Sequence, residues 1–147
     1  MQHSSGHKSG VSGLARSSAT QRHLTLRALE CVQRVSEGKE PCKPEEYSTL
    51  VMGLAPMLLQ NGLDQTCGFL LAKGNDRHWC VLQHMVTLVT GRAQMATRDE
   101  AQRWFREEVL RADQKTYRWM TRRALQAASA LKRYVQALLK DKDKHNK

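Results

Sequence analysis

Apolar residues recur every three or four positions along most of this chain, and such spacing predicts helices. The first run of this kind consists of Leu24, Ala28, Cys31, Val32 and Val35. It predicts a helix over residues 20–37, and Gly38 is a suitable stop because glycine often ends helices. A short polar loop separates this helix from the next apolar run.

A second helix is predicted to begin at Pro44, because proline suits the first helical position and the acidic pair Glu45-Glu46 complements the helix dipole. Its apolar face carries Leu50, Val51, Leu54, Met57 and Leu58. Pro56 lies inside this pattern, where its missing N–H should kink or break the helix. We expect the helix to end at Gln60-Asn61-Gly62, with Gly62 in the left-handed cap conformation.

The remaining apolar runs predict four more helices. The third covers residues 63–72, with Asp64 as its cap and Lys73-Gly74 as its end. The fourth begins near residue 76 and stops before Gly91. Thr97 and Glu100 have the spacing of a capping box, which opens a fifth helix. The sixth is predicted over residues 113–139, and its apolar face carries Tyr117, Met120, Ala124, Ala128, Leu131, Val135 and Leu138.

Length and composition agree with a single helical domain. The chain has 147 residues, of which 40% are hydrophobic and only 5% aromatic, so it can bury one core of modest size. Few prolines and many Ala, Leu, Arg and Gln residues favour an all-α fold. We predict a compact single-domain bundle of about six helices over residues 19–140. The Ser/Gly/His-rich residues 1–18 are expected to be disordered, and residues 141–147 to form a charged tail.

The positive charge of the chain is concentrated in its C-terminal third. The net charge is +10, and residues 98–147 contribute 14 basic and 7 acidic side chains, a surplus of +7. Such asymmetry favours a polyanionic partner, nucleic acid before membrane. A positively charged surface with no such partner is the alternative.

The basic residues of the last predicted helix fall on one face. With Arg118 as the origin and 100° per residue, the others lie within about 60° of it. These residues are Lys115, Arg118, Arg122, Lys132, Arg133 and Lys140. The row spans roughly 37 Å and could neutralise several backbone phosphates without reading base sequence. An ordinary solvated helix face, or one that lies on a membrane or in a partner's groove, remains open.

Trp119 lies near 100° on the same helix and flanks this basic face. Its ring could stack on a base, as aromatic side chains do in proteins that bind single strands. Packing on a neighbouring helix is the favoured interpretation, because buried aromatic side chains usually anchor cores.

The sequence offers little chemistry for catalysis or metal binding. It has no nucleophile signature, phosphate-binding loop or H-E-x-x-H motif, so we expect no enzyme and no cofactor. Cys31, Cys42, Cys67 and Cys80 form no C-x-x-C pair, and no metal site is predicted. His23 beside Arg22 could serve acid–base chemistry on RNA, but the sequence places no second histidine or tyrosine near it.

Two kinds of segment that would indicate export or a membrane location are not found in the sequence. The first residues contain no apolar run of the kind found in signal peptides. No segment reaches the roughly 20 apolar residues needed to span a membrane. A reducing cytoplasm is therefore the expected compartment.

One segment carries a specific resemblance. "YSTLVMGLAPMLLQNGLDQTCGFLLAKG", residues 47–74, resembles the small α-helical subunit of the type III-B (Cmr, RAMP-module) CRISPR effector complex. The shared positions in this segment are Pro56, Met57, Leu58, Leu59, Gln60, Asn61, Gly62, Leu63, Gln65, Thr66, Phe69, Leu70, Lys73 and Gly74. The pair Gln21-Arg22 also matches. The final block contributes Asp113, Tyr117, Arg118, Ala124, Leu125, Leu131, Lys132 and Arg133. The resemblance covers about residues 20–140.

The resemblance implies an all-α subunit that has no catalytic activity and takes part in antiviral defence. Copies of such subunits stack along the RNA-guided complex, opposite the backbone subunits, where crRNA pairs with target RNA. The expected partners are therefore other Cmr subunits, further copies of this chain, crRNA and target RNA, and no membrane. Sequence-indifferent phosphate contacts suit such a role.

Further residues are candidates for contact with RNA or with neighbouring subunits. Arg22, Arg27 and Lys73 join the basic face of the last helix as RNA-binding candidates. Gln60, Asn61, Gly62 and Gln65 have two interpretations. They form either a helix–helix turn, with Asn61 and Gly62 capping and Gln65 bonded to a buried backbone group, or a polar contact with a subunit or RNA. Beyond the subunit role, a stand-alone basic adaptor for an acidic protein and a small ribonuclease are the rival functions.

Overall fold

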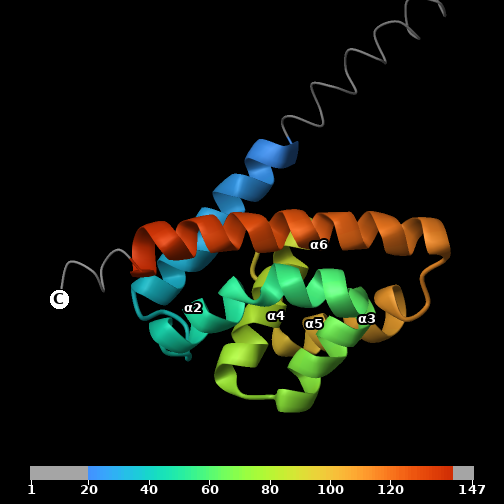
Figure 1. Ribbon diagram of the computed structural model, residues 1–147, viewed down its shortest axis with the longest axis horizontal. Helices are drawn as coiled ribbons and strands as arrows, with labels where there is room; N and C mark the ends of the chain where they lie inside the picture. Colours follow the sequence, from blue (N-terminus) through green and yellow to red (C-terminus); the bar gives the residue numbers. More distant parts are fainter. Residues whose placement is uncertain (1–19, 141–147) are drawn as a thin grey trace, which may run out of the picture.

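In the computed structural model, which describes residues 20–140, every regular element is a helix (Figure 1). After an N-terminal helix over residues 20–36, the elements in chain order are α2 (Pro44–Met52), α3 (Leu54–Lys73), α4 (Asp76–Thr90), α5 (Arg98–Trp104), the π-helix η1 (Phe105–Val109), α6 (Gln114–Val135) and the π-helix η2 (Gln136–Lys140). The predicted all-α bundle is confirmed. The tails predicted over residues 1–18 and 141–147 lie outside the described residues.

Helix α4 forms the centre of the bundle. Ten of its fifteen residues are buried, so it is covered around most of its circumference. It contacts α2, α3, α5 and α6, and α6 runs along one side of these helices as the longest element (Figure 1). The buried side of α6 carries Met120, Ala124, Ala128, Leu131 and Val135, which is the apolar face that the sequence predicted.

The second helix is shorter than predicted. It stops at Met52, and the backbone N–H of Gly53 donates to the carbonyls of Leu50 and Val51. Pro56 therefore does not break a helix but lies in the first turn of α3, which begins at Leu54. A first-turn residue has no intrahelical N–H partner to lose, so proline is tolerated there.

The predicted turn at Gly62 is a kink inside α3. Gly62 has φ 86° and ψ 166°, a conformation outside the left-handed cap region that we expected. Asp64, which we expected to cap a new helix, instead accepts a hydrogen bond from the Tyr117 hydroxyl at 2.8 Å. The Tyr117 oxygen accepts in turn from the Asp64 backbone N–H at 3.3 Å. The N–H that the kink leaves free is thus bonded to α6.

Helix ends elsewhere follow the predicted signals. Gly74 and Gly91 both adopt left-handed conformations and end α3 and α4. Thr97 and Glu100 form the predicted capping box: the Thr97 hydroxyl accepts from the Glu100 N–H, and the Glu100 carboxylate accepts from the Thr97 N–H. These caps fix where α4 ends and α5 begins, and so fix the loop between them.

The fifth helix ends in a wide π-helical turn that an α-helical pattern cannot predict. In an α-helix, Glu108 would follow the buried Trp104 one turn later. The π-helical turn, closed by the Leu110 N–H on the Phe105 carbonyl at 3.0 Å, adds a residue to that turn. Within this turn Val109 is buried and Glu108 is exposed.

Candidate nucleic-acid interface

Helix α6 presents a face that is purely basic. Its 22 residues include six lysines and arginines and no acid. Asp113 starts the helix, because its carboxylate accepts the Thr116 backbone N–H at 2.7 Å. Hydrogen bonds from the backbone and side chain of Thr116, and from the backbone of Lys115, lower the pKa of the Asp113 carboxyl. The Asp113 carboxylate is therefore committed to the cap.

The basic side chains predicted on α6 are exposed and unpaired. Lys115, Arg118, Arg122, Lys132 and Arg133 are all exposed. None of them has an ion pair or hydrogen bond to another of the described residues, in contrast to arginines elsewhere such as Arg77, Arg98 and Arg103. The side chain of Lys140 lies outside the described part of the structure. The five positive charges are thus available to an external anion.

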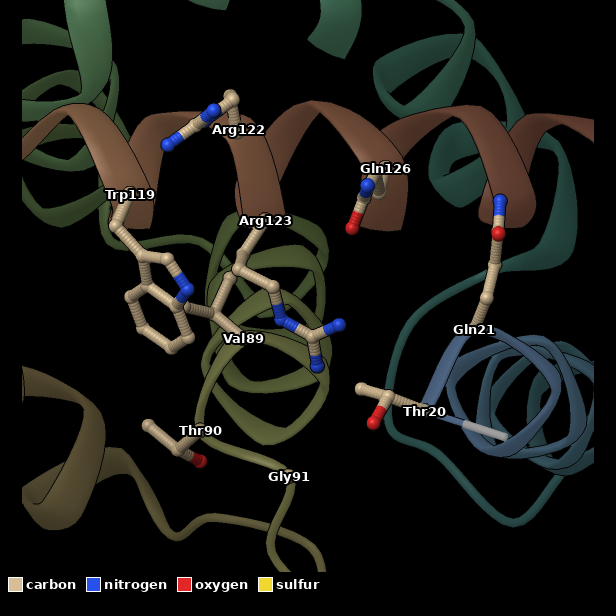
Figure 2. A pocket seen from close by; sticks show the side chains of 9 residues that line it. All are labelled: Thr20, Gln21, Val89, Thr90, Gly91, Trp119, Arg122, Arg123 and Gln126. Carbon is tan, nitrogen blue, oxygen red and sulfur yellow. The ribbon is translucent and has the colours of Figure 1, made fainter. Parts of the chain in front are cut away.

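A hollow of about 560 Å³ opens beside this face (Figure 2). Helix α6, the end of α4 and the start of the N-terminal helix enclose it. The lining residues are Thr20, Gln21, Val89, Thr90, Gly91, Trp119, Arg122, Arg123 and Gln126. It combines two guanidinium groups, amides, hydroxyls and one indole, a set that can contact phosphate, ribose and base.

Arg123 reaches from α6 toward the end of α4, whereas Arg122 points away from it (Figure 2). One Arg123 Nη donates to the Leu88 carbonyl at 3.0 Å, near the C-terminus of α4. Its Nε is buried and has no partner. Burial lowers the pKa of the guanidinium. Arg123 is therefore fixed in place by α4 with donor capacity left over.

Trp119 lies at the edge of the hollow rather than in the core. Its side chain is 51% exposed. The favoured prediction, that Trp119 is a buried anchor packed on a neighbouring helix, is therefore wrong. Trp119 lines both this hollow and a second one, to which Glu100, Glu107 and Glu108 contribute. An indole held at the rim in this way has a face free for stacking.

The three candidates outside α6 have different surroundings. Arg22 is exposed, on the N-terminal helix beside Tyr134 of α6. Arg27 is engaged: it pairs with Glu30 at 3.3 Å and donates to the backbone carbonyls of Arg92 and Ala93. Lys73 is exposed above the Phe69 ring, 5.7 Å from its centroid. Arg27 therefore has a structural role in holding the loop after α4.

The polar residues at the kink separate into two groups. Gly62 makes the turn, whereas Gln60, Asn61 and Gln65 are exposed. Gln65 therefore does not satisfy a buried backbone group, as one interpretation required. Leu59, next to them, is 71% exposed. The interpretation of these residues as a contact with a subunit or RNA stays a prediction.

Sequence reasoning missed Arg123, Gln126 and Thr90 as lining residues of the hollow. Arg123 lies about 140° from Arg118, at the border of the apolar face. An arginine at that border was a usable signal, because a charged group there must find a partner. Nothing local marked Thr90, since only the packing of α4 on α6 brings it to the site.

The described residues offer no assembled acid–base pair for cleavage of RNA. His23 is exposed on the N-terminal helix without a described partner, and the other histidines of the described region are buried in α4. None of the described helices is long and apolar enough to cross a membrane.

Comparison with known proteins agrees with the resemblance noted in the sequence. No curated protein and no solved structure matches the chain. A family model does match, over residues 20–138, and its description is CRISPR-associated protein (Cas_Cmr5). The match covers the whole described bundle except its last two residues. The chain therefore belongs to the Cas_Cmr5 family and is a component of the type III-B Cmr complex.

Proposed function

We propose that this chain is a non-catalytic structural subunit that stacks along the type III-B complex and helps to hold crRNA paired with target RNA. The observation that carries this proposal is the row of five exposed, unpaired basic side chains on α6. Between Lys115 and Arg133 the row is roughly 27 Å long, at about 1.5 Å per residue. A straight row of charges on a rigid helix suits the regular spacing of phosphates.

The basic row is expected to bind RNA independently of its base sequence, which supports the same role. The lysines and arginines of the row carry no partner that would orient them toward base edges, so they read charge and backbone shape. A subunit that must accept every guide needs this property, since base pairing supplies the specificity in RNA-guided complexes.

The hollow beside the row adds a contact of a different kind. Arg123, Gln126 and Trp119 line it, and the Trp119 side chain is 51% exposed. In this proposal a phosphate or ribose of the target strand lies against Arg123 and Gln126, with Trp119 beside a base. The combination favours RNA over an acidic protein, which has no base to stack.

The test is to neutralise the row within the assembled complex. Arg118→Gln, Arg122→Gln, Lys132→Gln and Arg133→Gln together remove four positive charges without reversing any. We expect weaker capture of target RNA and a slope of log affinity against log salt that is shallower by about 2.8–3.6 if all four phosphate contacts are lost, at about 0.7–0.9 per contact. Unchanged capture and an unchanged slope contradict the proposal.

A control with the same charge change separates this effect from net charge. Lys39→Gln, Arg77→Gln, Arg98→Gln and Arg103→Gln also remove four charges, but from side chains that are already paired with acids. We expect this variant to capture RNA like the unmodified complex. Binding of the chain to a protein partner that survives nuclease treatment, with no RNA bound, instead supports the adaptor function.

A further inference from the structure

Four side chains with metal-ligand chemistry meet between the loop before α2 and the middle of α4. Glu40 and Cys42 lie in the loop over residues 37–43, two positions apart. Cys80 and His84 lie on α4, one helical turn apart, so both side chains project from the same face. The packing of the loop on α4 places the two pairs opposite each other.

The donor atoms are close together and shielded from water. Ligand atoms of Glu40, Cys80 and His84 all lie within 4.8 Å of one another, and His84 Nε2 is 2.8 Å from Glu40 Oε2. The Cys42 thiol lies beside the Cys80 thiol, at the edge of this group, and has to turn toward the other donors to become the fourth ligand. His84 is fully buried, Cys80 and Cys42 are buried, and only Glu40 keeps partial contact with solvent.

The groups around this cluster are placed as a second shell requires. The Tyr47 hydroxyl lies 2.8 Å from His84 Nδ1, which fixes the ring and directs Nε2 toward Glu40. Metal-binding histidines are held through their second nitrogen in this way. Arg34 Nε lies 3.5 Å from Glu40 Oε2. Two thiolates, one carboxylate and a neutral imidazole around Zn²⁺ total −1, which the Arg34 guanidinium offsets.

We propose that Glu40, Cys42, Cys80 and His84 bind one Zn²⁺ ion. Two sulfur, one nitrogen and one oxygen donor match the borderline softness of zinc and its preference for four ligands. At the bond lengths zinc prefers, tetrahedral donors are about 3.3–3.8 Å apart. The three atoms within 4.8 Å therefore need to move by about 1 Å or less. The site is closed, so its role is to tie the loop to α4.

The site was not predicted from the sequence because its ligands come in pairs without the C-x-x-C spacing. The absence of that motif led to the expectation of no metal site. The two cysteines are 38 positions apart along the chain, and only the fold brings them together. The motif E-x-C followed by C-x-x-x-H is what a search along the chain would have to look for.

The first experiment measures zinc uptake by the full chain. The protein is reduced and treated with a chelator, then exposed to Zn²⁺ and dialysed, and its metal content is measured. We expect about one Zn²⁺ per chain. At free Zn²⁺ about 100 times the dissociation constant, the midpoint of thermal unfolding should rise by roughly 5–10 °C. A reduced, folded chain that retains no Zn²⁺ overturns the proposal.

Cobalt provides a spectroscopic probe of the ligands in the unmodified chain. Co²⁺ in a tetrahedral site with two thiolates should show strong visible ligand-field bands and a thiolate charge-transfer band in the near ultraviolet. Addition of Zn²⁺ should remove both. A spectrum typical of six oxygen ligands, or formation of a Cys42–Cys80 disulfide in place of metal binding, contradicts the site.

Variants then assign the ligands. Cys42→Ser and Cys80→Ser should each weaken Zn²⁺ binding by more than about 100-fold, because loss of an outer-shell partner alone costs about 10- to 100-fold. Cys67→Ala is the matched control, since Cys67 is a buried thiol in α3 outside the cluster and burial raises its pKa to about 12. The control should keep full stoichiometry. Equal loss in the control and in both serine variants overturns the assignment.

Discussion

Gly62 is the residue on which the kink in α3 depends. Its φ of 86° and ψ of 166° belong to a region that glycine alone adopts readily. A Cβ at this position would also lie 3.1 Å from the Tyr117 hydroxyl and 3.2 Å from Asp64 Oδ1. Both atoms belong to the hydrogen bonds that join α3 to α6. Strain in the backbone and disruption of those bonds therefore act together.

We predict that Gly62→Ala lowers the free energy of unfolding by about 1–3 kcal/mol, as expected for a side chain forced into such a conformation. Urea denaturation followed by circular dichroism measures the change. Gly68→Ala in the same helix is the control, because Gly68 has no atom within 4 Å of its would-be Cβ and an ordinary φ. It should be neutral or stabilising by up to about 1 kcal/mol. Equal effects of the two substitutions contradict this account.

At the scale of the element, α6 depends on the charge of its cap. Hydrogen bonds from the backbone and side chain of Thr116 lower the pKa of Asp113 below its ordinary value of 3.8. A carboxyl with a lowered pKa in the folded state stabilises the fold above that ordinary value, and the stability is lost as the pH falls through the folded pKa. The end of α6 is therefore sensitive to acid.

We predict that Asp113→Asn reduces this sensitivity, because asparagine also caps helices but does not titrate. Between about pH 6 and about pH 3, the urea concentration at the midpoint of unfolding should fall further for the unmodified chain than for the variant. Asp99→Asn removes the same charge from an exposed residue that pairs with Arg103, and serves as the control. Parallel losses in the unmodified chain and Asp113→Asn would falsify the role of the cap.

Much of each element could be predicted from sequence, because helix signals are local. Apolar spacing and caps such as Thr97, Gly74 and Gly91 correctly placed most helices and the apolar side of α6. Prediction failed where two local signals competed. Gly53 ended α2 before Pro56 could, and the fifth helix continued after Trp104 as a π-helical turn rather than as an α-helix. The basic row was a pattern within one helix and was therefore visible, whereas the hollow depends on the packing of three helices.

At the scale of the whole molecule, stability should be greatest around α4. This helix is buried around most of its circumference, whereas only three of the nine residues of α2 are buried. Amides that open only when the whole chain unfolds are the slowest to exchange with solvent. The distribution of burial thus predicts an order of exchange.

We predict that amides in the second half of α4 show the slowest hydrogen exchange and report the global free energy of unfolding. Amides of α2 should exchange faster through local opening. Exchange of the metal-free chain, followed by mass spectrometry after proteolysis, resolves the two helices. Exchange in α2 as slow as in α4 contradicts this order and indicates that the bundle opens only as a unit.

The unpaired charge on α6 also has a consequence for how long the free chain survives in a cell. Like charges on one helix face repel one another and weaken the fold, and a bound polyanion relieves that repulsion. A copy outside its complex therefore unfolds more often than an assembled one, and unfolded chains are removed by proteases. On the proposed function, assembly on RNA would set the abundance of the subunit, because surplus copies are the first to be degraded.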